Sequence, residues 1–322
     1  MKSLIARESG VAFEDLPDSD LPKTGVTVDV AYSSLNYKDG LAVTGRGRIV
    51  RKFPMVLGID LAGTVVDSDS DDFKTGDRVL GTGQGLGELI WGGYTERARV
   101  PADAILRVPD GLSLEQAMHL GTAGITAMLC VLALEQNDVV PDDREILVTG
   151  AAGGVGSLAV MLLAKRGYRV AASTGRPQLE DYLRGLGATS IVHRDELSSP
   201  GAPMQKERWA GAVDTVGGAT LANAYAQTAY GGAVAACGMA GGHELNTTVW
   251  PMILRNVSFL GVSSLRTPKA KRVTAWDRLA TDADAAKLAE MSRTEPLSRI
   301  FELGEEILDG RIRGRVAIDV TS

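Results

Sequence analysis

The sequence predicts an α/β protein of two domains, in which a doubly wound parallel sheet follows a β-rich region. Three observations predict this arrangement. The chain has 322 residues, and a domain usually has about 150. Before residue 110, short β-rich runs alternate with Gly, Pro and Asp turns; after residue 141, strand-like and helical runs alternate, as in βαβ units. A glycine-rich turn joins the first strand and helix of this second region.

The first region is expected to hold four strands before its first clear helix. The strand-like runs are Val26–Ser33, Gly63–Asp67, Asp77–Gly81 and Tyr94–Val100. Ser113 and Gln116 have the spacing of a capping box and predict a helix start. The apolar run Leu120–Leu134 spans 15 residues, fewer than the roughly 20 that a membrane span needs. It therefore predicts a buried core helix, and no membrane partner is expected.

The second region alternates predicted strands and helices. The strands are Glu145–Thr149, Arg169–Ser173, Ser190–His193, Ala212–Val216 and Ala233–Cys237, and the helices are Val155–Arg166, Leu179–Leu186 and Leu221–Tyr230. This order predicts a parallel sheet with helices on both faces. Beyond it, Leu297–Leu308 is expected to be helical. The strand-like run Arg315–Val320 is hypothesised to return to the first domain, which would make that domain discontinuous.

The composition argues against several classes of function. The chain has 34 Lys and Arg against 40 Asp and Glu, a net charge of −6, so nucleic-acid binding over a broad basic surface is not expected. Cys130 and Cys237 lie in apolar runs and are expected to be buried, reduced thiols. The N-terminus shows no apolar signal-peptide core. Together with the two reduced cysteines, this predicts a cytoplasmic protein. The cysteines and histidines show no zinc-site spacing, so no metal is expected, although an all-carboxylate site stays open.

The sharpest motif is Gly-Ala-Ala-Gly-Gly-Val-Gly at residues 150–156. It follows a predicted strand and opens a predicted helix, which is the context of a dinucleotide-binding loop. Glycine lets a diphosphate approach bare backbone, and the helix N-terminus supplies N–H groups and the positive end of a dipole. The spacing differs from the commoner G-x-G-x-x-G, and an ordinary glycine-rich turn is the alternative interpretation.

The end of the next predicted strand indicates which nucleotide is bound. NADH sites usually place an Asp or Glu there for the ribose hydroxyls. This chain has Ser173, Thr174, Gly175 and Arg176, and its next acid, Glu180, falls inside the following helix. Hydroxyls and a guanidinium suit a 2′-phosphate, so we expect NADPH. The alternative is that Arg176 is a solvated loop residue.

Asn36, Tyr37 and Asp39 form a dense polar cluster directly after a predicted strand. They are the candidate catalytic residues. Tyr37 is expected either to donate a proton or to pack against the nicotinamide. Asn36 could bond the carboxamide or a substrate oxygen, and Asp39 could orient either group. A polar strand end with a buried tyrosine is the alternative.

Residues 54–66, Pro-Met-Val-Leu-Gly-Ile-Asp-Leu-Ala-Gly-Thr-Val-Val, resemble the signature of the medium-chain dehydrogenases/reductases. Zinc members of that superfamily carry His-Glu where this chain has Ile59 and Asp60, and the structural zinc cysteines are missing too. The resemblance therefore points to the zinc-free quinone-oxidoreductase branch. Residues 34–39, 91–93, 121–124 and 253–257 are similar, in the same order, to the NADPH-dependent acryloyl-CoA reductases.

This resemblance implies a Rossmann-type NADPH-binding domain at residues 122–262 and a GroES-like, β-rich catalytic domain at residues 1–121 and 263–322, in a homodimer. It implies reduction of acryloyl-CoA, a short 2-enoyl-CoA, to propanoyl-CoA. By position, it implies that the cofactor-binding residues are Tyr37, Ala152, Gly153, Gly154, Val155, Thr174, Gly175, Arg176, Arg194, Met239, Ile253 and Ser264.

The expected partner is thus a small-molecule CoA thioester. A basic stretch of Arg46, Arg48, Arg51 and Lys52 could attract its phosphates or could be a solvated loop. Two other functions stay open. One is a quinone or enone reductase of the same fold. The other is a catalytically idle NADPH-binding protein, against which the retained Asn36–Asp39 cluster argues.

Overall fold

The computed structural model describes all residues of the chain, 1–322, and divides them into two compact units. The first unit comprises residues 1–125, 264–280 and 288–322. The second comprises residues 126–263 and 281–287.

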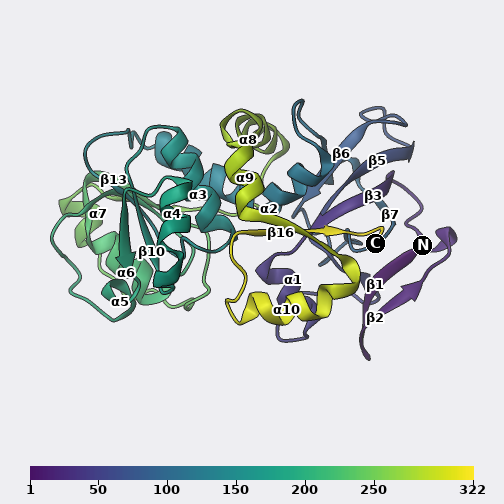
Figure 1. Ribbon diagram of the computed structural model, residues 1–322, viewed down its shortest axis with the longest axis horizontal. Helices are drawn as coiled ribbons and strands as arrows, with labels where there is room; N and C mark the ends of the chain where they lie inside the picture. The colour runs from purple at the N-terminus through teal and green to yellow at the C-terminus, as the bar shows by residue number, and fades with distance from the viewer. The chain divides into compact units, whose positions relative to one another are not determined.

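The second unit holds one six-stranded parallel sheet (Figure 1). Its strands lie in the order β11 (Ser190–His193), β10 (Val170–Thr174), β9 (Ile146–Val148), β12 (Trp209–Asp214), β13 (Thr228–Ala236) and β14 (Ser258–Gly261). In chain order this is 3-2-1-4-5-6, the order of a doubly wound Rossmann sheet. The predicted fold class is therefore confirmed for this unit. The strand order reverses between β9 and β12, and such a reversal opens a crevice at the carboxyl ends of the strands.

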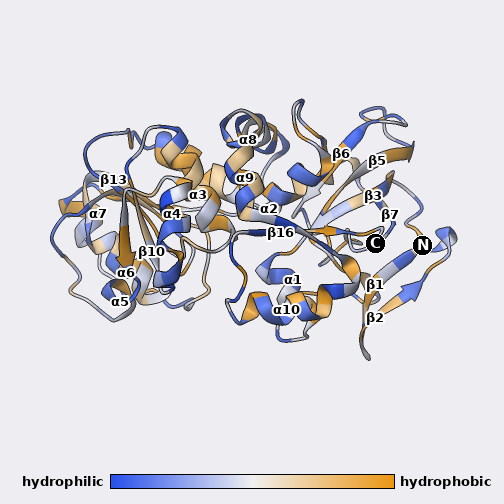
Figure 2. Ribbon diagram, viewed as in Figure 1, coloured by the Kyte–Doolittle hydropathy of each residue, from blue (hydrophilic) through white to orange (hydrophobic).

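Helices cover both faces of this sheet (Figure 1). α5 (Asp195–Ser198) and α6 (Gly218–Ala226) bury Leu197, Leu221 and Tyr225 in one cluster with the strand residues Ala212 and Val234. α3 (Gly154–Lys165) packs instead against β9, β10 and α4 (Glu180–Leu186). The central strands β9 and β10 are buried along their whole length, and much of this sheet is coloured as hydrophobic in Figure 2.

One predicted element of this unit is wrong at its C-terminal end. The helix expected over Leu221–Tyr230 ends at Ala226, and β13 begins at Thr228. β13 pairs with β12 on one side and with β14 on the other. This pairing decides the conformation of a segment whose apolar pattern alone fits a helix.

The first unit holds a larger, mostly antiparallel sheet and a small three-stranded one. The larger sheet contains β15 (Ser292–Pro296), β16 (Arg315–Asp319), β3 (Val26–Ser34), β5 (Asp60–Ser68), β6 (Arg78–Thr82) and β8 (Ile105–Arg107) in that order, with β7 (Arg97–Val100) paired to β3. The small sheet contains β2 (Gly10–Asp15), β1 (Lys2–Arg7) and β4 (Met55–Val56). β16 pairs antiparallel with β3, which confirms that the last strand returns to the first part of the chain.

Besides α2, the remaining α-helices are α1 (Tyr37–Val43), α7 (Trp250–Leu254), α8 (Lys269–Asp282), α9 (Ala285–Met291) and α10 (Ile300–Leu308). α1 and α10 contact each other in the first unit (Figure 1). A Cβ at Gly40 of α1 would collide with the Ile307 side chain of α10, so a glycine at this position allows the two helices to approach closely.

α2 (Leu114–Glu135) contains the apolar run that the sequence singled out. Its capping box is confirmed: the Ser113 N–H donates to Gln116 Oε1 at 2.9 Å, and the Gln116 N–H donates to Ser113 Oγ at 3.0 Å. Gly121 interrupts the helix with φ 52° and ψ −154°. By length and composition α2 could cross a membrane, but 72% of its apolar window is buried inside the protein, as in a core helix.

Candidate active site

The glycine motif forms the turn between β9 and α3, as predicted. Gly150 has φ 60°, in the left-handed region that favours glycine. A Cβ at Gly156 would collide with the Gly150 carbonyl, so the close contact between helix and turn requires glycine there. Gly153 is the N-cap of α3 and offers no side-chain cap. The first N–H groups of α3 are therefore left for water or for an anionic ligand.

The end of β10 brings three predicted cofactor residues together beside this loop. The Arg176 Nη2 donates to the Ala152 carbonyl at 3.0 Å, and the Arg176 N–H donates to Thr174 Oγ1 at 3.1 Å. The Arg194 guanidinium lies directly over Gly175, where any Cβ would collide with it. Burial lowers the pKa of Arg176, because a partly desolvated cation is less favourable.

The nearest acid in the sequence lies on the following helix, α4, and is paired there. Glu180 Oε1 accepts from Arg184 Nε at 2.9 Å, so the nearest acid in sequence is held by its own helix. Two guanidiniums and a hydroxyl therefore lie at the position where NADH sites usually carry an acid. This arrangement fits a phosphate monoester better than a ribose diol.

The other predicted cofactor residues are spread over the two units. Met239 and Ile253 lie in the second unit and are each 70% exposed. Tyr37 and Ser264 belong to the first unit. The Ser264 carbonyl accepts from Gln84 Nε2 at 3.2 Å.

The predicted catalytic cluster forms the N-terminus of α1. Asn36 is the N-cap, and its N–H and Nδ2 both donate to Asp39 Oδ2, at 2.9 and 3.0 Å. Asp39 Oδ1 accepts from the Ile59 N–H at 3.0 Å. Both residues are buried, and Tyr37 is 47% exposed. The first turn of α1 therefore holds Asn36 and Asp39 inside and presents Tyr37 at the surface.

Asp60 lies at the centre of this buried network, and the sequence reasoning missed its role. Its Oδ2 accepts from Ser34 Oγ at 2.5 Å, from Asn36 Nδ2 at 3.0 Å and from the Thr122 N–H at 2.8 Å. Its Oδ1 accepts from Thr122 Oγ1 at 2.5 Å. A Cβ at Gly121 would crowd the Asp60 carboxylate, which explains the glycine interrupting α2.

Arg315 supplies the positive charge of the network. It is 3% exposed, and its Nη2 donates to Ser34 Oγ at 3.0 Å. Its Nη1 donates to the Leu35 carbonyl at 3.1 Å and to Asn36 Oδ1 at 3.3 Å. The sequence signal that could have found it is an arginine opening an otherwise apolar strand, because a buried arginine needs acceptors.

The buried carboxylates of Asp39 and Asp60 both lie near the single buried cation of this network, Arg315. Burial, together with the nearby Asp60 charge, raises the pKa of Asp39 to about 7. Asp39 is therefore close to half protonated near neutral pH, whereas an ordinary aspartate is ionised.

Two basic residues, one in α1 and one just after it, form ion pairs with carboxylates. Of the basic stretch, Arg46 is paired with Glu305 at 2.5 Å, so its charge is already balanced. Lys38, next to Tyr37, pairs with Glu88 at 2.7 Å.

Cys130 is buried as expected, but Cys237 is only half-buried, which corrects that expectation; both are free thiols. No three His, Cys, Asp or Glu side chains are grouped so that they could hold a metal ion.

A Rossmann sheet with an uncapped glycine loop, together with an antiparallel β unit that presents a polar helix start, defines a two-domain oxidoreductase that uses a dinucleotide. The comparisons agree. Residues 22–110 match the family described as "Alcohol dehydrogenase GroES-like domain", and residues 154–281 match the one described as "Zinc-binding dehydrogenase".

Similar proteins cover nearly the whole chain. It is 51% identical to the "Probable acrylyl-CoA reductase AcuI" of Escherichia coli over 98% of both chains, and 50% identical to the "Acrylyl-CoA reductase AcuI" of Ruegeria pomeroyi over 98% of this chain and 97% of that protein. It is 45% identical to the "Putative quinone oxidoreductase YhfP" of Bacillus subtilis over 97% of this chain and 96% of that one.

The crystal structure of the yhdH oxidoreductase from Salmonella enterica in complex with NADP has a TM-score of 0.96, with 49% identity over 99% of each chain. The chain therefore belongs to the medium-chain dehydrogenase/reductase superfamily, in its quinone-oxidoreductase-like branch.

Proposed function

We propose that this protein reduces acryloyl-CoA, a short 2-enoyl-CoA, to propanoyl-CoA with NADPH. One hydride and one proton add across the carbon–carbon double bond, and NADPH leaves as NADP⁺. The observation that carries this proposal is about 50% identity to two acrylyl-CoA reductases over nearly the full length. The second unit is proposed as the NADPH-binding domain and the first as the catalytic domain.

The phosphate-binding residues of the second unit support NADPH as the cofactor. The backbone at Ala152, Gly153, Gly154 and Val155 would hold the diphosphate, because an uncapped helix begins there. Thr174, Gly175, Arg176 and Arg194 would hold the 2′-phosphate, since they supply two cations and a hydroxyl. Met239, Ile253, Tyr37 and Ser264 are proposed to line the rest of the cofactor site.

The catalytic residues divide into one that can touch the substrate and two that position it. NADPH, when bound, supplies the hydride. Tyr37 is half-exposed and its hydroxyl has no hydrogen bond within the protein, so it can contact the nicotinamide or donate a proton. Asn36 donates to Asp39, Asp60 and Ser34, which leaves its amide no spare hydrogen. We therefore propose Asn36 and Asp39 as positioning residues.

The reaction is proposed to need no metal. Four hydrogen bonds occupy the Asp60 carboxylate, which stands in the zinc-site segment of the family signature. A carboxylate saturated with donors is not available as a metal ligand. The neighbouring Ile59 offers no ligand atom.

We also propose a cytoplasmic homodimer. β14 is an edge strand of the second unit's sheet, so its outer backbone groups are unpaired. In the same unit, Trp250, Met252 and Leu254 of α7 are each about half exposed or more. An open strand edge and exposed apolar side chains are the features by which a second copy could extend the sheet.

The decisive experiment follows NADPH oxidation with acryloyl-CoA, crotonyl-CoA and a simple quinone in parallel. We expect the highest kcat/KM for acryloyl-CoA, weak use of NADH, and no loss of rate after dialysis against a strong chelator. A bound zinc ion whose removal abolishes turnover would contradict the metal-free mechanism.

The second candidate function is reduction of quinones or enones. The similarity to the Bacillus subtilis protein favours it. A kcat/KM for the quinone far above that for either enoyl-CoA would select it.

A further inference from the structure

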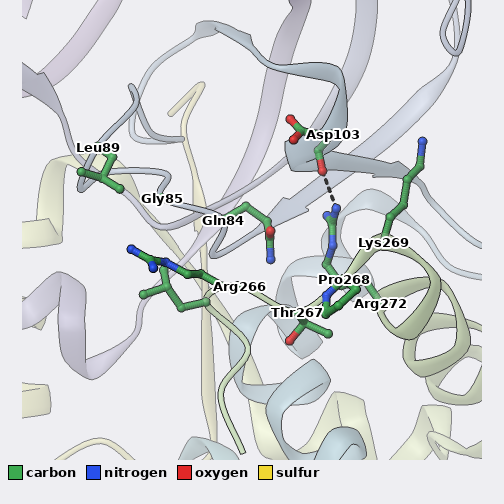
Figure 3. A pocket seen from close by; sticks show the side chains of 10 residues that line it. Gln84, Gly85, Leu89, Asp103, Arg266, Thr267, Pro268, Lys269 and Arg272 are labelled. Carbon is green, nitrogen blue, oxygen red and sulfur yellow. Dashed lines mark hydrogen bonds between the residues drawn. The ribbon is translucent and has the colours of Figure 1, made fainter.

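A cavity of about 310 Å³ in the first unit takes no part in the proposed chemistry. It lies between the loop 83–90 and the segment 265–272, which enters α8 (Figure 3). Gln84, Leu89, Arg266 and Arg272 are among its lining residues. The volume is at the lower end of the 300–1,000 Å³ typical of small-molecule sites. It therefore suits one end of a larger ligand.

The charge of the cavity is opposite to that of the chain. Arg266, Lys269 and Arg272 line it, against the single acid Asp103, although the chain carries a net charge of −6. Lys269 is paired with Asp72 at 2.9 Å. Arg266 is exposed, and the structure gives its guanidinium no carboxylate partner. The cavity is thus a local positive site within an acidic protein.

Arg272 is a buried cation without a bonded counter-charge. It is 3% exposed, its Nη2 donates to the Asp103 carbonyl (Figure 3), and its Nη1 donates to the Ala104 carbonyl at 3.4 Å. Its Nε has no hydrogen-bond acceptor. The Asp103 charge acts on Arg272 from nearby, but no carboxylate hydrogen-bonds to it. A buried guanidinium that lines a cavity and keeps an N–H without an acceptor can bind an anionic ligand.

The N-terminus of α8 reinforces this field. α8 has 14 residues, and its first turn contains no acid. The first turn instead carries Lys269, Lys271 and Arg272. The N-terminus of a helix is the positive end of its dipole, where acidic residues are usual. Basic residues there add to the dipole and concentrate positive potential at the cavity.

The loop 83–90 connects the cavity to the start of α1. Gln84 and Leu89 of this loop line the cavity, and Glu88 between them pairs with Lys38, next to Tyr37, at 2.7 Å. The same short loop therefore lines the cavity and contacts the residue next to Tyr37. A CoA thioester is a ligand with an anionic end far from its reacting end, because a long pantetheine arm separates its phosphates from the acyl group.

We propose that this cavity binds the phosphorylated adenosine end of the CoA thioester, with Arg266 and Arg272 as the phosphate ligands. The proposal rests on the proposed function and names where its substrate is held. It also assigns this role to residues outside the Arg46–Lys52 stretch.

The test measures KM values for the variant Arg266→Gln with acryloyl-CoA and with acryloyl-pantetheine, which lacks the nucleotide. We expect KM for acryloyl-CoA to rise at least about tenfold, as for a lost charge-assisted contact. KM for acryloyl-pantetheine and for NADPH should stay unchanged. Arg48→Gln is the matched control, because it removes the same charge from an exposed arginine of the same unit that does not line the cavity. Arg266→Lys should restore part of the affinity.

Calorimetry with adenosine 3′,5′-bisphosphate separates this proposal from the proposed function. The wild type should bind this probe and Arg266→Gln should bind it at least about tenfold more weakly. If the wild type reduced no enoyl-CoA but showed this difference, the function would fail and the cavity assignment would stand. Equal KM values for acryloyl-CoA in Arg266→Gln and the wild type would overturn the assignment. A raised KM for NADPH alone would overturn it too, because the anion would then be the pyridine nucleotide.

Discussion

The two units hold their candidate functional residues in different ways. In the second unit, the turn proposed to bind phosphate is made of backbone: Gly150 and Gly156 set its shape, and the uncapped start of α3 provides its N–H groups. In the first unit, the start of α1 is held by side chains, with Asp60 and Arg315 buried at its centre. The two units should therefore fail in different ways when single residues are changed.

A backbone site depends on the absence of side chains, and its shape survives most substitutions nearby. A buried polar network depends on every member, because each donor or acceptor left unpaired inside a protein is costly. Changes in the network should therefore lower the stability of the protein, whereas changes beside the glycine turn should lower the affinity for cofactor. The following predictions test this difference.

The largest effect is expected from Arg315→Met. Removing the cation leaves the buried Asp60 charge without compensation, which typically costs about 3–5 kcal/mol in the free energy of unfolding. Urea denaturation followed by circular dichroism measures the loss. Arg311→Met is the control, because Arg311 is exposed at the surface and surface changes usually fall within about 0.5 kcal/mol. Similar losses in the two variants would show that the network does not depend on Arg315.

The pH dependence of the free energy of unfolding should reveal the ionisation of Asp39. Its pKa is raised from 3.8 to about 7 in the folded protein, so the unfolded chain ionises first as pH rises. The folded state then binds the extra proton, and the free energy of unfolding falls between about pH 4 and pH 7, on the order of a few kcal/mol. Asp39→Asn should flatten this fall in a series of urea midpoints. A wild-type midpoint that rises over the same interval would contradict the prediction.

The smallest effect is expected from Arg176→Ala. Its loss should raise KM for NADPH at least tenfold, equivalent to about 1.4 kcal/mol. KM for NADH and the urea midpoint should barely change. Arg184→Ala is the control, because Arg184 pairs with Glu180 on α4. Equal use of NADPH and NADH by the wild type would contradict the proposed role of Arg176.

The sequence could predict the parts whose signal is local. The glycine turn follows a strand and opens a helix as its spacing indicates, and Ser113 and Gln116 form their capping box. β1 was missed because Leu4, Ile5 and Ala6 are all buried, so the strand shows no alternation. α1 was missed because its start, Asn36–Asp39, was interpreted as a polar cluster alone.

The centre of the network could not be found from sequence, because its members are far apart along the chain. Asp60 and Thr122 hydrogen-bond across 62 residues, and Arg315 and Ser34 across 281. The apolar run around Asp60 indicates that its carboxylate is buried, but it does not indicate which residues bond to it. Only the pairing of β3 with β5 and β16 brings these side chains together.

The return of β16 to β3 also sets the order in which the newly made chain can fold. Domains fold as units while the ribosome adds about 5–20 residues per second. Most of the second unit, residues 126–263, is continuous and emerges complete, but the first unit must wait for a strand at the C-terminus. Asp60 and Arg315 can be buried together only after Arg315 has been made. The nascent protein thus holds the complete parallel sheet of the second unit while the large sheet of the first unit still lacks β16, and a chain truncated before Arg315 would never gain that strand.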